Sequence, residues 1–599
     1  MKVKKILCLL LALVFVLSVF VGCSSNEEQT DITDVNSSGA GSAPEEDTPP
    51  EVECLDIVKD GAAVDIVYSK LSTAYELKAA NSIAASIKNM SGAISKVRFE
   101  TENYDPSAVE IVVGSTNYSE TREVMEQLGY SEGVISIVGN KIIILGSDEE
   151  SYDTLAQRFA IALNNGKDKD KNIKIPTDYT ISVSTNELVA SLPTIKDVSP
   201  SYIKDAGDDC YVLMFPDATL DTVEGYISSL VSHGYSEYAS NTIDNNRYYT
   251  YTNSDNVVNV AFTGYNKEMK VIVESQSDTA LPTRESDNKW SAVSGVTTTI
   301  SQLGLYYETD GSVVADPRSS DNPYFNGMSY VIRLKDGSFI VIDGGHSKSI
   351  DGTRLYNVMK KQAPDPDNIV IAAWFFTHGH SDHTGFLASF CQNYASKVKV
   401  EQFVYNFPSV NEINDSDQAR ADGTVAKHFK NVPVVKAHPG QVFHIRNSKI
   451  TMLYTNDLWV YGKQELKTAN EASLVFTVEL EGKKFMVLGD YYDDLGILRS
   501  LYSSSTLKSD IMQVSHHGIS NCGTLLYPII APEWALWPLG TDYIKEYDRV
   551  ISEHRMNAYM KTMDKNKVFM AKDDIVILTL DNGNIASQVF ETDAIYLAS

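Results

Sequence analysis

The sequence is poor in cysteine and in positive charge, and each shortage narrows the classes of protein to which it can belong. Its six cysteines are scattered over 599 residues without a CxxC pair, so disulfides need not be invoked. Lysine and arginine number 51 against 79 aspartates and glutamates, which gives a formal net charge of −28. This charge argues against broad attraction to nucleic acid or anionic surfaces. Nucleic acid is therefore disfavoured as a partner, although a local basic groove is not ruled out.

The chain also lacks a long apolar run at its start. The apolar stretch Ile6–Val21 has 16 residues, short of the about 20 that span a bilayer. Three lysines precede it and small residues follow, which predicts a signal peptide over residues 1–23. Cys23 directly after a glycine resembles a bacterial lipobox, so we expect a lipid anchor at Cys23 and an extracytoplasmic protein held to the bacterial cell membrane. The alternative is an uncleaved anchor. Residues 24–50 are rich in Ser, Glu, Asp and Pro and predict a disordered tether.

Histidine is scarce too, yet three of the 11 histidines fall within six positions. His378, His380, Asp382 and His383 follow the apolar run 369–376, which predicts a buried strand that leads into a loop. Such loops at the carboxyl ends of strands usually carry the sites of α/β proteins. The spacing suits one ion held by the first two histidines and a second held by Asp382 and His383. Imidazole and carboxylate without thiolate favour zinc, with manganese or iron as alternatives, in an open catalytic site.

The motif H-x-H-x-D-H resembles the signature of the metallo-β-lactamase fold. The resemblance covers about the last 300 residues and implies an α/β fold with an αββα sandwich over residues 293–599. It implies that Asp343, at the end of the strand 338–342, supports the metal site from behind the ligands. Asp490, after the strand 484–488, matches the family's carboxylate that bridges the two metals.

A paired histidine follows another predicted strand, in the run 510–518. By resemblance, His517 is the last ligand of the second metal, and His516 lies beside the substrate as a hydrogen-bond donor or proton carrier. We expect the two side chains to lie on opposite sides of an extended chain. Which of the two histidines is the ligand stays open at this point.

One ligand of most two-metal relatives is missing. No histidine lies in the stretch 450–476 between the cluster and Asp490, where they carry a third histidine for the first metal. The pattern Asn470-x-x-Ser-Leu-Val and the His-His-Gly motif resemble one branch of the family, which includes the hydrolase domain of competence DNA-uptake channel proteins. Teichoic-acid phosphorylcholine esterases share the His-His-Gly motif. The resemblance implies that Asn470 lies behind the ligands and that one or two ions are bound.

Two smaller α/β or α+β domains are expected before the hydrolase domain. Residues 51–190 alternate strands and helices, with a capping box at Thr73–Glu76. They resemble the non-catalytic N-terminal domain of some bacterial hexosaminidases and glucuronidases, which favours a scaffold or surface-binding role. Residues 195–276 predict a helix over 219–233 followed by three strands.

The second small domain carries a run of tyrosines in the predicted strands. Tyr248, Tyr249 and Tyr251 suggest a sugar-stacking strip, but packing within a sheet is the favoured interpretation. A polar linker over 277–292 leads into the hydrolase domain.

These patterns together predict a lipid-anchored, metal-dependent hydrolase, with phosphodiesters as the favoured substrates. The resemblance implies hydroxide activated by the metal, with Asp382, Asp490 and His516 as the catalytic side chains. A small molecule or a cell-wall polymer is the expected substrate. Two alternatives stay open, a cell-surface binding protein with a vestigial metal site and a hydrolase of lactams or esters.

Overall fold

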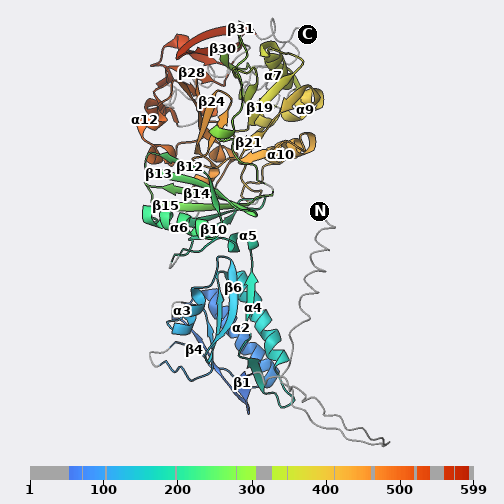
Figure 1. The fold of residues 1–599 in the computed structure, drawn as a ribbon, viewed down its shortest axis with the longest axis vertical. Helices are drawn as coiled ribbons and strands as arrows, with labels where there is room; N and C mark the ends of the chain where they lie inside the picture. Colours follow the sequence, from blue (N-terminus) through green and yellow to red (C-terminus); the bar gives the residue numbers. More distant parts are fainter. Residues whose placement is uncertain are drawn as a thin grey trace, which may run out of the picture. The chain divides into compact units, whose positions relative to one another are not determined.

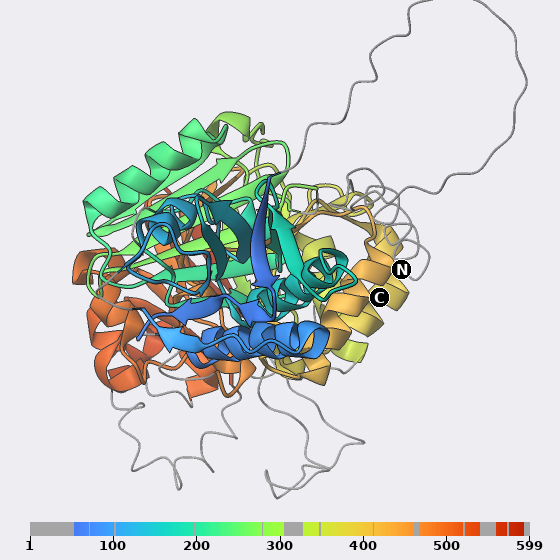
Figure 2. The same cartoon turned by 90° about the horizontal axis from the view of Figure 1, so that it is seen from below.

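The computed structural model describes residues 53–591 apart from 71, 101–103, 196–197, 278, 305–326, 347–348, 411, 460–465, 519–521, 540–558 and 572–573. The expected signal peptide, Cys23 and the tether lie outside these residues. The chain divides into two compact units, residues 1–196 and 197–599, coloured blue to teal and green to red in Figures 1 and 2. None of the helices within the described ranges is both apolar enough and long enough to cross a bilayer. Cys54, Cys210, Cys391 and Cys522 are free thiols.

The first unit is an α/β domain. Its six-stranded sheet has the order β4-β3-β5-β7-β6-β9, in which β4, β3, β5 and β7 run parallel. Thr73 caps α2 in a capping box with Glu76, as the sequence predicts. The strands are β1 (Cys54–Lys59), β2 (Ala62–Ala63), β3 (Asp65–Tyr68), β4 (Val97–Phe99), β5 (Glu110–Val113), β6 (Glu132–Val138), β7 (Lys141–Gly146), β8 (Ile173–Pro176) and β9 (Ile181–Ser184). The helices are α2 (Ala74–Ser91), α3 (Ser119–Met125), α4 (Glu149–Asn165) and α5 (Glu187–Ala190).

The second unit begins with a six-stranded antiparallel sheet of order β10-β11-β15-β14-β13-β12. Four strands follow its helix α6 (Leu220–Ser232), so the expectation of three strands was wrong. The extra strand is β12, an edge strand whose residues are mostly exposed and therefore lack a clear apolar alternation. Tyr248 and Tyr251 are buried, which supports packing over a sugar-stacking strip. The strands are β10 (Tyr202–Asp205), β11 (Cys210–Phe215), β12 (Ser236–Ile243), β13 (Asn246–Thr252), β14 (Asn256–Thr263) and β15 (Glu268–Ser275).

The rest of the second unit is built on two larger sheets. One has the order β22-β21-β19-β18-β17-β16-β30-β31, with β20 beside β19, and the other has the order β23-β24-β25-β26-β27-β28-β29. Apolar side chains from both sheets, such as Ile342, Phe375, Phe476 and Val487, form one buried core. The outer face of the first sheet packs against helices α7 and α9, and that of the second against α11 and α14. This arrangement is an αββα sandwich (Figure 1).

The elements of the sandwich have the following bounds. The strands are β16 (Thr298–Gln302), β17 (Ser329–Arg333), β18 (Phe339–Asp343), β19 (Ile369–Phe375), β20 (Val398–Val400), β21 (Phe403–Tyr405), β22 (Val434–Lys436), β23 (Val442–Ile445), β24 (Ser448–Tyr454), β25 (Val475–Leu480), β26 (Lys483–Val487), β27 (Ile511–Gln513), β28 (Trp534–Trp537), β29 (Val568–Met570), β30 (Asp574–Asp581) and β31 (Asn584–Glu591). The helices are α7 (Ser349–Gln362), α8 (Ser381–Thr384), α9 (Leu387–Tyr394), α10 (Ser416–His428), α11 (Ile497–Leu501), α12 (Ser504–Leu507), α13 (Cys522–Leu525) and α14 (Tyr527–Ile530).

Strand direction brings the candidate site residues to one edge of the sandwich. Strands β18 and β19 are parallel, as are β26 and β27, so each pair ends at the same edge of its sheet. The predicted site residues lie at these ends: Asp343 on β18, the histidine cluster after β19, Asp490 after β26 and the paired histidines after β27.

Candidate metal centre

The histidine cluster begins in the turn after β19, with His378 and His380, and continues into the short helix α8, which contains Asp382 and His383. His378 Nε2 lies 3.1 Å from His380 Nδ1, and these two side chains form one potential ligand group with Asp490. Gly379 between them packs against Gln418, because a Cβ there would lie 2.6 Å from the Gln418 Cβ. Helix α10 therefore packs closely against the backbone between the two imidazoles.

A second ligand group shares Asp490 with the first. It contains Asp382, His383, Asp490 and His517. His383 Nε2 lies 3.2 Å from Asp490 Oδ1, and His517 Nε2 lies 3.1 Å from Asp382 Oδ2. Because Asp490 belongs to both groups, its two oxygens can serve two cations at once. The structure thus brings together all six residues that the sequence proposed as ligands.

The hydrogen bonds of these side chains fit a metal. Nε2 of His383, Nε2 of His517 and Oδ1 of Asp490 are buried without a hydrogen-bond partner. The other ring nitrogens are engaged, with His383 Nδ1 2.7 Å from Asp343 Oδ2 and His517 Nδ1 2.8 Å from the Pro538 carbonyl. In its neutral form, with the proton on Nδ1, each imidazole would offer a lone pair on Nε2, which is how protein imidazoles bind a divalent cation.

Asp343 holds this arrangement from behind. Its carboxylate accepts hydrogen bonds from the Thr377 amide at 2.8 Å and the Thr377 hydroxyl at 2.7 Å, in addition to the His383 contact. Asp343 has a left-handed backbone, with φ of 53°, which aspartate tolerates better than most residues. Burial raises the pKa of the Asp343 carboxyl, while the His383 imidazole opposes that rise. The side chain is placed as the sequence proposed.

The electrostatics of the second group favour a cation. Burial alone would raise the pKa of Asp490, yet the surrounding histidines, His383 foremost, hold it well below its usual range. Burial works against a charge on His517, but Asp490 and Asp382 raise the pKa of His517 to about 10. The carboxylates therefore keep their negative charge and attract positive charge to the centre.

Comparison with known proteins agrees with this geometry. Residues 323–457 match the family model of the metallo-beta-lactamase superfamily. The second unit contains a metallo-β-lactamase domain. This fold supports a metal-dependent hydrolase or a related enzyme. No curated protein sequence matches the chain.

Several solved structures are similar to parts of the chain. The metallo-beta-lactamase fold protein YhfI from Bacillus subtilis is 12% identical over 46% of this chain and 97% of its own, with a TM-score of 0.28. Zn(2+)-bound PqqB from Methylobacterium extorquens is 14% identical over 36% of this chain and 71% of its own, with a TM-score of 0.24. CmlA, a diiron beta-hydroxylase from Streptomyces venezuelae, is 9% identical over 45% of this chain and 53% of its own, with a TM-score of 0.27.

The paired histidines of the metallo-β-lactamase domain adopt a backbone that the sequence did not suggest. His516 and His517 are both left-handed, with φ of 45° and 54°, so the expected extended chain was wrong. The turn directs His517 into the ligand group. His516 instead lies at its edge, with Nε2 3.4 Å from Asn470 Nδ2 and the ring 5.0 Å from that of Tyr492. Burial lowers the pKa of His516, which favours a neutral imidazole there.

Within the described residues, neither ligand group of the metallo-β-lactamase domain includes a further histidine. His438, which precedes the strand β23, is buried between two carboxylates of its own, 3.1 Å from Glu274 and 2.9 Å from Asp457. The first group accordingly keeps two histidines and one shared carboxylate, as the sequence indicated.

Sequence reasoning missed Asp415. Its Oδ2 lies 3.6 Å from His380 Nε2, whereas the other ring nitrogen, Nδ1, faces His378 Nε2. Its Oδ1 accepts from the amides of Asp417 and Gln418 and caps α10. The cap is visible in the sequence as Asp before a helix, but the approach to His380 arises only from the fold.

Proposed function

We propose that this protein is a metal-dependent hydrolase of phosphodiester bonds, anchored by a lipid at Cys23 outside the cytoplasm of a bacterial cell. One observation carries the proposal of a metal-dependent reaction. Two ligand groups share Asp490, and the second group presents buried atoms without a hydrogen-bond partner, namely His383 Nε2, His517 Nε2 and Asp490 Oδ1. A buried polar atom without a partner is costly, and a divalent cation would satisfy several of them together.

The roles of the side chains follow from their placement. His378, His380 and Asp490 would hold one ion, and the Asp382 group would hold the other. When bound, zinc, manganese or iron would act as a Lewis acid and acidify a water molecule. Asp490 is ionised and belongs to both ligand groups, so its negative charge would face both ions.

His516 is the side chain best placed to meet a substrate. It is 17% exposed, against 1% for His517, and Nε2 lies 3.6 Å from Asp490 Oδ2. It would donate a hydrogen bond to a substrate oxygen or carry a proton to the leaving group. Asn470 lies beside it and would fix the orientation of its ring.

Phosphodiesters are favoured over lactams by the pattern around the centre. The His-His-Gly turn and the absence of a third histidine from the first ligand group resemble the branch that includes the competence-channel hydrolase domains. A teichoic-acid or nucleotide phosphodiester would be reachable from the outer face of the membrane. A free phosphodiester or a cell-wall polymer is therefore the proposed substrate class.

A substrate panel tests this proposal. Metal-depleted protein receives zinc or manganese and is assayed with bis(p-nitrophenyl) phosphate, p-nitrophenyl acetate and a chromogenic β-lactam. The proposal predicts that the phosphodiester is turned over fastest and that His380→Ala abolishes the reaction. His428→Ala, at an exposed histidine of α10, is the matched control and should retain activity. Preference for the lactam or the ester would overturn the substrate class, and metal binding without any turnover would favour a binding protein.

A further inference from the structure

The antiparallel sheet β10–β15 contacts the metallo-β-lactamase domain through charged side chains that are largely buried. Lys204 on β10 reaches Glu412 in the loop before α10, with 2.8 Å between Nζ and Oε2, and the two side chains are only 10% and 15% exposed. Lys270 on β15 donates to the carbonyls of Asp457 and Trp459 at 2.7 and 2.8 Å. These contacts join the sheet β10–β15 to two loops of the metallo-β-lactamase domain.

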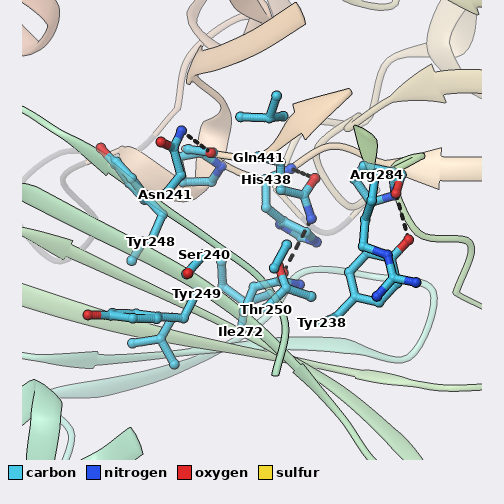
Figure 3. Close-up of a pocket in the computed structure, with 18 residues that line it drawn as sticks. Tyr238, Ser240, Asn241, Tyr248, Tyr249, Thr250, Ile272, Arg284, His438 and Gln441 are labelled. Atoms are coloured by element: carbon cyan, nitrogen blue, oxygen red, sulfur yellow. Dashed lines mark hydrogen bonds between the residues drawn. The ribbon is translucent and has the colours of Figure 1, made fainter. Parts of the chain in front are cut away.

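The same face of the sheet surrounds a narrow pocket. Figure 3 shows His438 and Gln441 of the metallo-β-lactamase domain beside Thr250 of the sheet. Gln441 Nε2 donates to Asn259 Oδ1 at 3.3 Å, and Asn259 also accepts from Thr250 at 2.7 Å. The contact between sheet and domain is therefore specific and polar.

Glu412 lies within a tight turn that leads to the metal centre. Its amide donates to the Ser409 carbonyl at 2.9 Å, and the Ile413 amide donates to the same carbonyl at 3.0 Å. The Asp415 amide then donates to the Ile413 carbonyl at 3.0 Å. Gly207, in the loop between β10 and β11, also contacts this turn, since a Cβ there would be 3.1 Å from the Ser409 Cβ. The sheet and its β10–β11 loop therefore contact the turn at two residues, Glu412 and Ser409.

The turn ends at the side chains that back the first ligand group. Asp415 Oδ2 is 3.6 Å from His380 Nε2. Gln418 packs on Gly379 and donates to the Pro408 carbonyl at 2.6 Å. A shift of the turn would move both the partner of His380 and the support of the backbone between the two ligands.

A stabilising role alone explains the Lys204–Glu412 pair poorly. Taking both charges out of water is costly, and such pairs are often no better for stability than apolar residues. Burial lowers the pKa of Lys204, with Glu412 acting against that shift. Such a pair instead fixes the position of Glu412 and its turn relative to β10.

We propose that the sheet β10–β15 is a positioning element of the metal centre: Lys204, through Glu412, fixes Asp415 against His380 and so sets the affinity of the ion held by His378, His380 and Asp490. Lys204, Glu412 and Asp415 touch neither metal nor substrate and act through His380. The inference rests on the proposed function in so far as these residues hold metal.

Zinc affinity measured by competition with a chromophoric chelator tests the inference in the full chain. The affinity for one zinc ion should fall by about 10-fold or more in each of the variants Lys204→Met, Glu412→Gln and Asp415→Asn. This is the usual effect of losing a group that orients a ligand. The double variant Lys204→Met/Asp415→Asn should lose no more than either single variant, because the two act through one contact. Lys449→Met breaks an exposed ion pair with Glu479 and serves as the matched control.

Thermal unfolding measured alongside separates positioning from folding. Should Glu412→Gln, the milder and nearly isosteric change, lower the melting temperature while every bound ion keeps its wild-type affinity, the sheet only supports the fold and the inference is wrong. A wild-type protein that binds zinc and hydrolyses phosphodiesters, with variants equal to it in affinity, overturns the inference alone. A wild-type protein that binds no metal overturns the proposed function and the inference together.

Discussion

At the scale of the residue, the imidazoles of the second ligand group are each held at one nitrogen and bare at the other. His383 owes this state to Asp343, and His517 owes it to the Pro538 carbonyl. The two supports differ in kind, because a carboxylate also strengthens the basicity of the ring that it contacts. Metal binding should therefore be sensitive to the loss of the Asp343 charge, even when the replacement side chain has nearly the same size.

Asp343→Asn tests that sensitivity. Asparagine tolerates the left-handed backbone at this position, so the loop should keep its shape while the charged acceptor of His383 is lost. We expect zinc affinity to fall by about 10- to 100-fold, measured by chelator competition. Asp217→Asn is a control at an exposed aspartate with nearly the same φ, 54°, and should bind zinc normally. Unchanged affinity in Asp343→Asn would show that the carboxylate does not tune His383.

The paired histidines should fail in different ways when replaced by alanine. His517→Ala removes a bare Nε2 from the second ligand group, so metal content and turnover should be lost together. His516→Ala should retain its metal but lose turnover by a factor on the order of 10²–10³, the usual effect of removing one positioned donor or acid. Metal analysis and phosphodiester assays decide between them. If His516→Ala is the metal-poor variant, the two roles are exchanged.

Local spacing explains which site residues can be predicted from the sequence. His378, His380, Asp382 and His383 fall within six positions, so their chemistry can be recognised without a fold. Asp415 lies 35 positions after His380 with no motif of its own, and only the packing of α10 against Gly379 brings it near. The left-handed turn at the paired histidines contains no preceding glycine that would have signalled it.

At the scale of the element, apolar periodicity indicated the strands that are buried. Strand β19 and strand β26 were predicted because both of their faces pack into cores, which produces near-continuous apolar runs. Strand β12 was missed because it is an exposed edge strand with polar residues on both faces. Burial explains both results, because an apolar sequence pattern indicates a strand only where the side chains of that strand are buried.

The turn before β23 carries a pH-dependent contact between sheet and sandwich. Both ring nitrogens of His438 face carboxylates, Glu274 and Asp457, and Lys204 and Lys436 lie close to the same network. Burial opposes a charge on His438, but Glu274 and Asp457 raise the pKa of His438 to about 9. The folded protein thus binds this proton more tightly than the unfolded chain, whose histidine pKa is about 6.5.

Stability should accordingly fall as the pH rises through this window. The contribution of His438 is fully present below about pH 6.5 and is lost as the pH passes about 9, because the folded state must then release its proton. The loss is on the order of 3 kcal/mol. Urea unfolding of wild type and His438→Gln at pH 6 and pH 9.5 measures it, and the variant should show a smaller decrease. An equal decrease in both proteins would contradict this assignment.

At the scale of the whole molecule, the candidate metal centre lies in the sandwich. The N-terminal α/β unit and the antiparallel sheet, which contacts loops of the sandwich, precede it in the sequence. The charged contacts of Lys204, Lys270 and His438 lie on the same face of the antiparallel sheet. They join the antiparallel sheet and the metallo-β-lactamase domain within the second compact unit. The N-terminal unit shows no ligand group of this kind among its described residues.

The proposed location depends on Cys23. If the lipobox-like sequence is processed as expected, Cys23→Ala should leave the protein without lipid, and it should appear in the medium or in the wrong compartment. Fractionation of cells that express the wild type and the variant measures this. Cys54→Ala, at a partly exposed cysteine of β1, is the matched control and should stay with the membrane. Retention of Cys23→Ala in the membrane fraction would show that the anchor lies elsewhere.

The most direct test of the central claim is phosphodiester turnover recorded while metal is returned to depleted protein, with bound metal counted in the same samples. The account predicts that the wild type binds one to two ions per chain and that its turnover rises with occupancy and levels off when the centre is full. In Asp490→Ala, both the bound metal and the turnover should be lost. Turnover in metal-free protein, or fully loaded protein that leaves every phosphodiester intact, would contradict it.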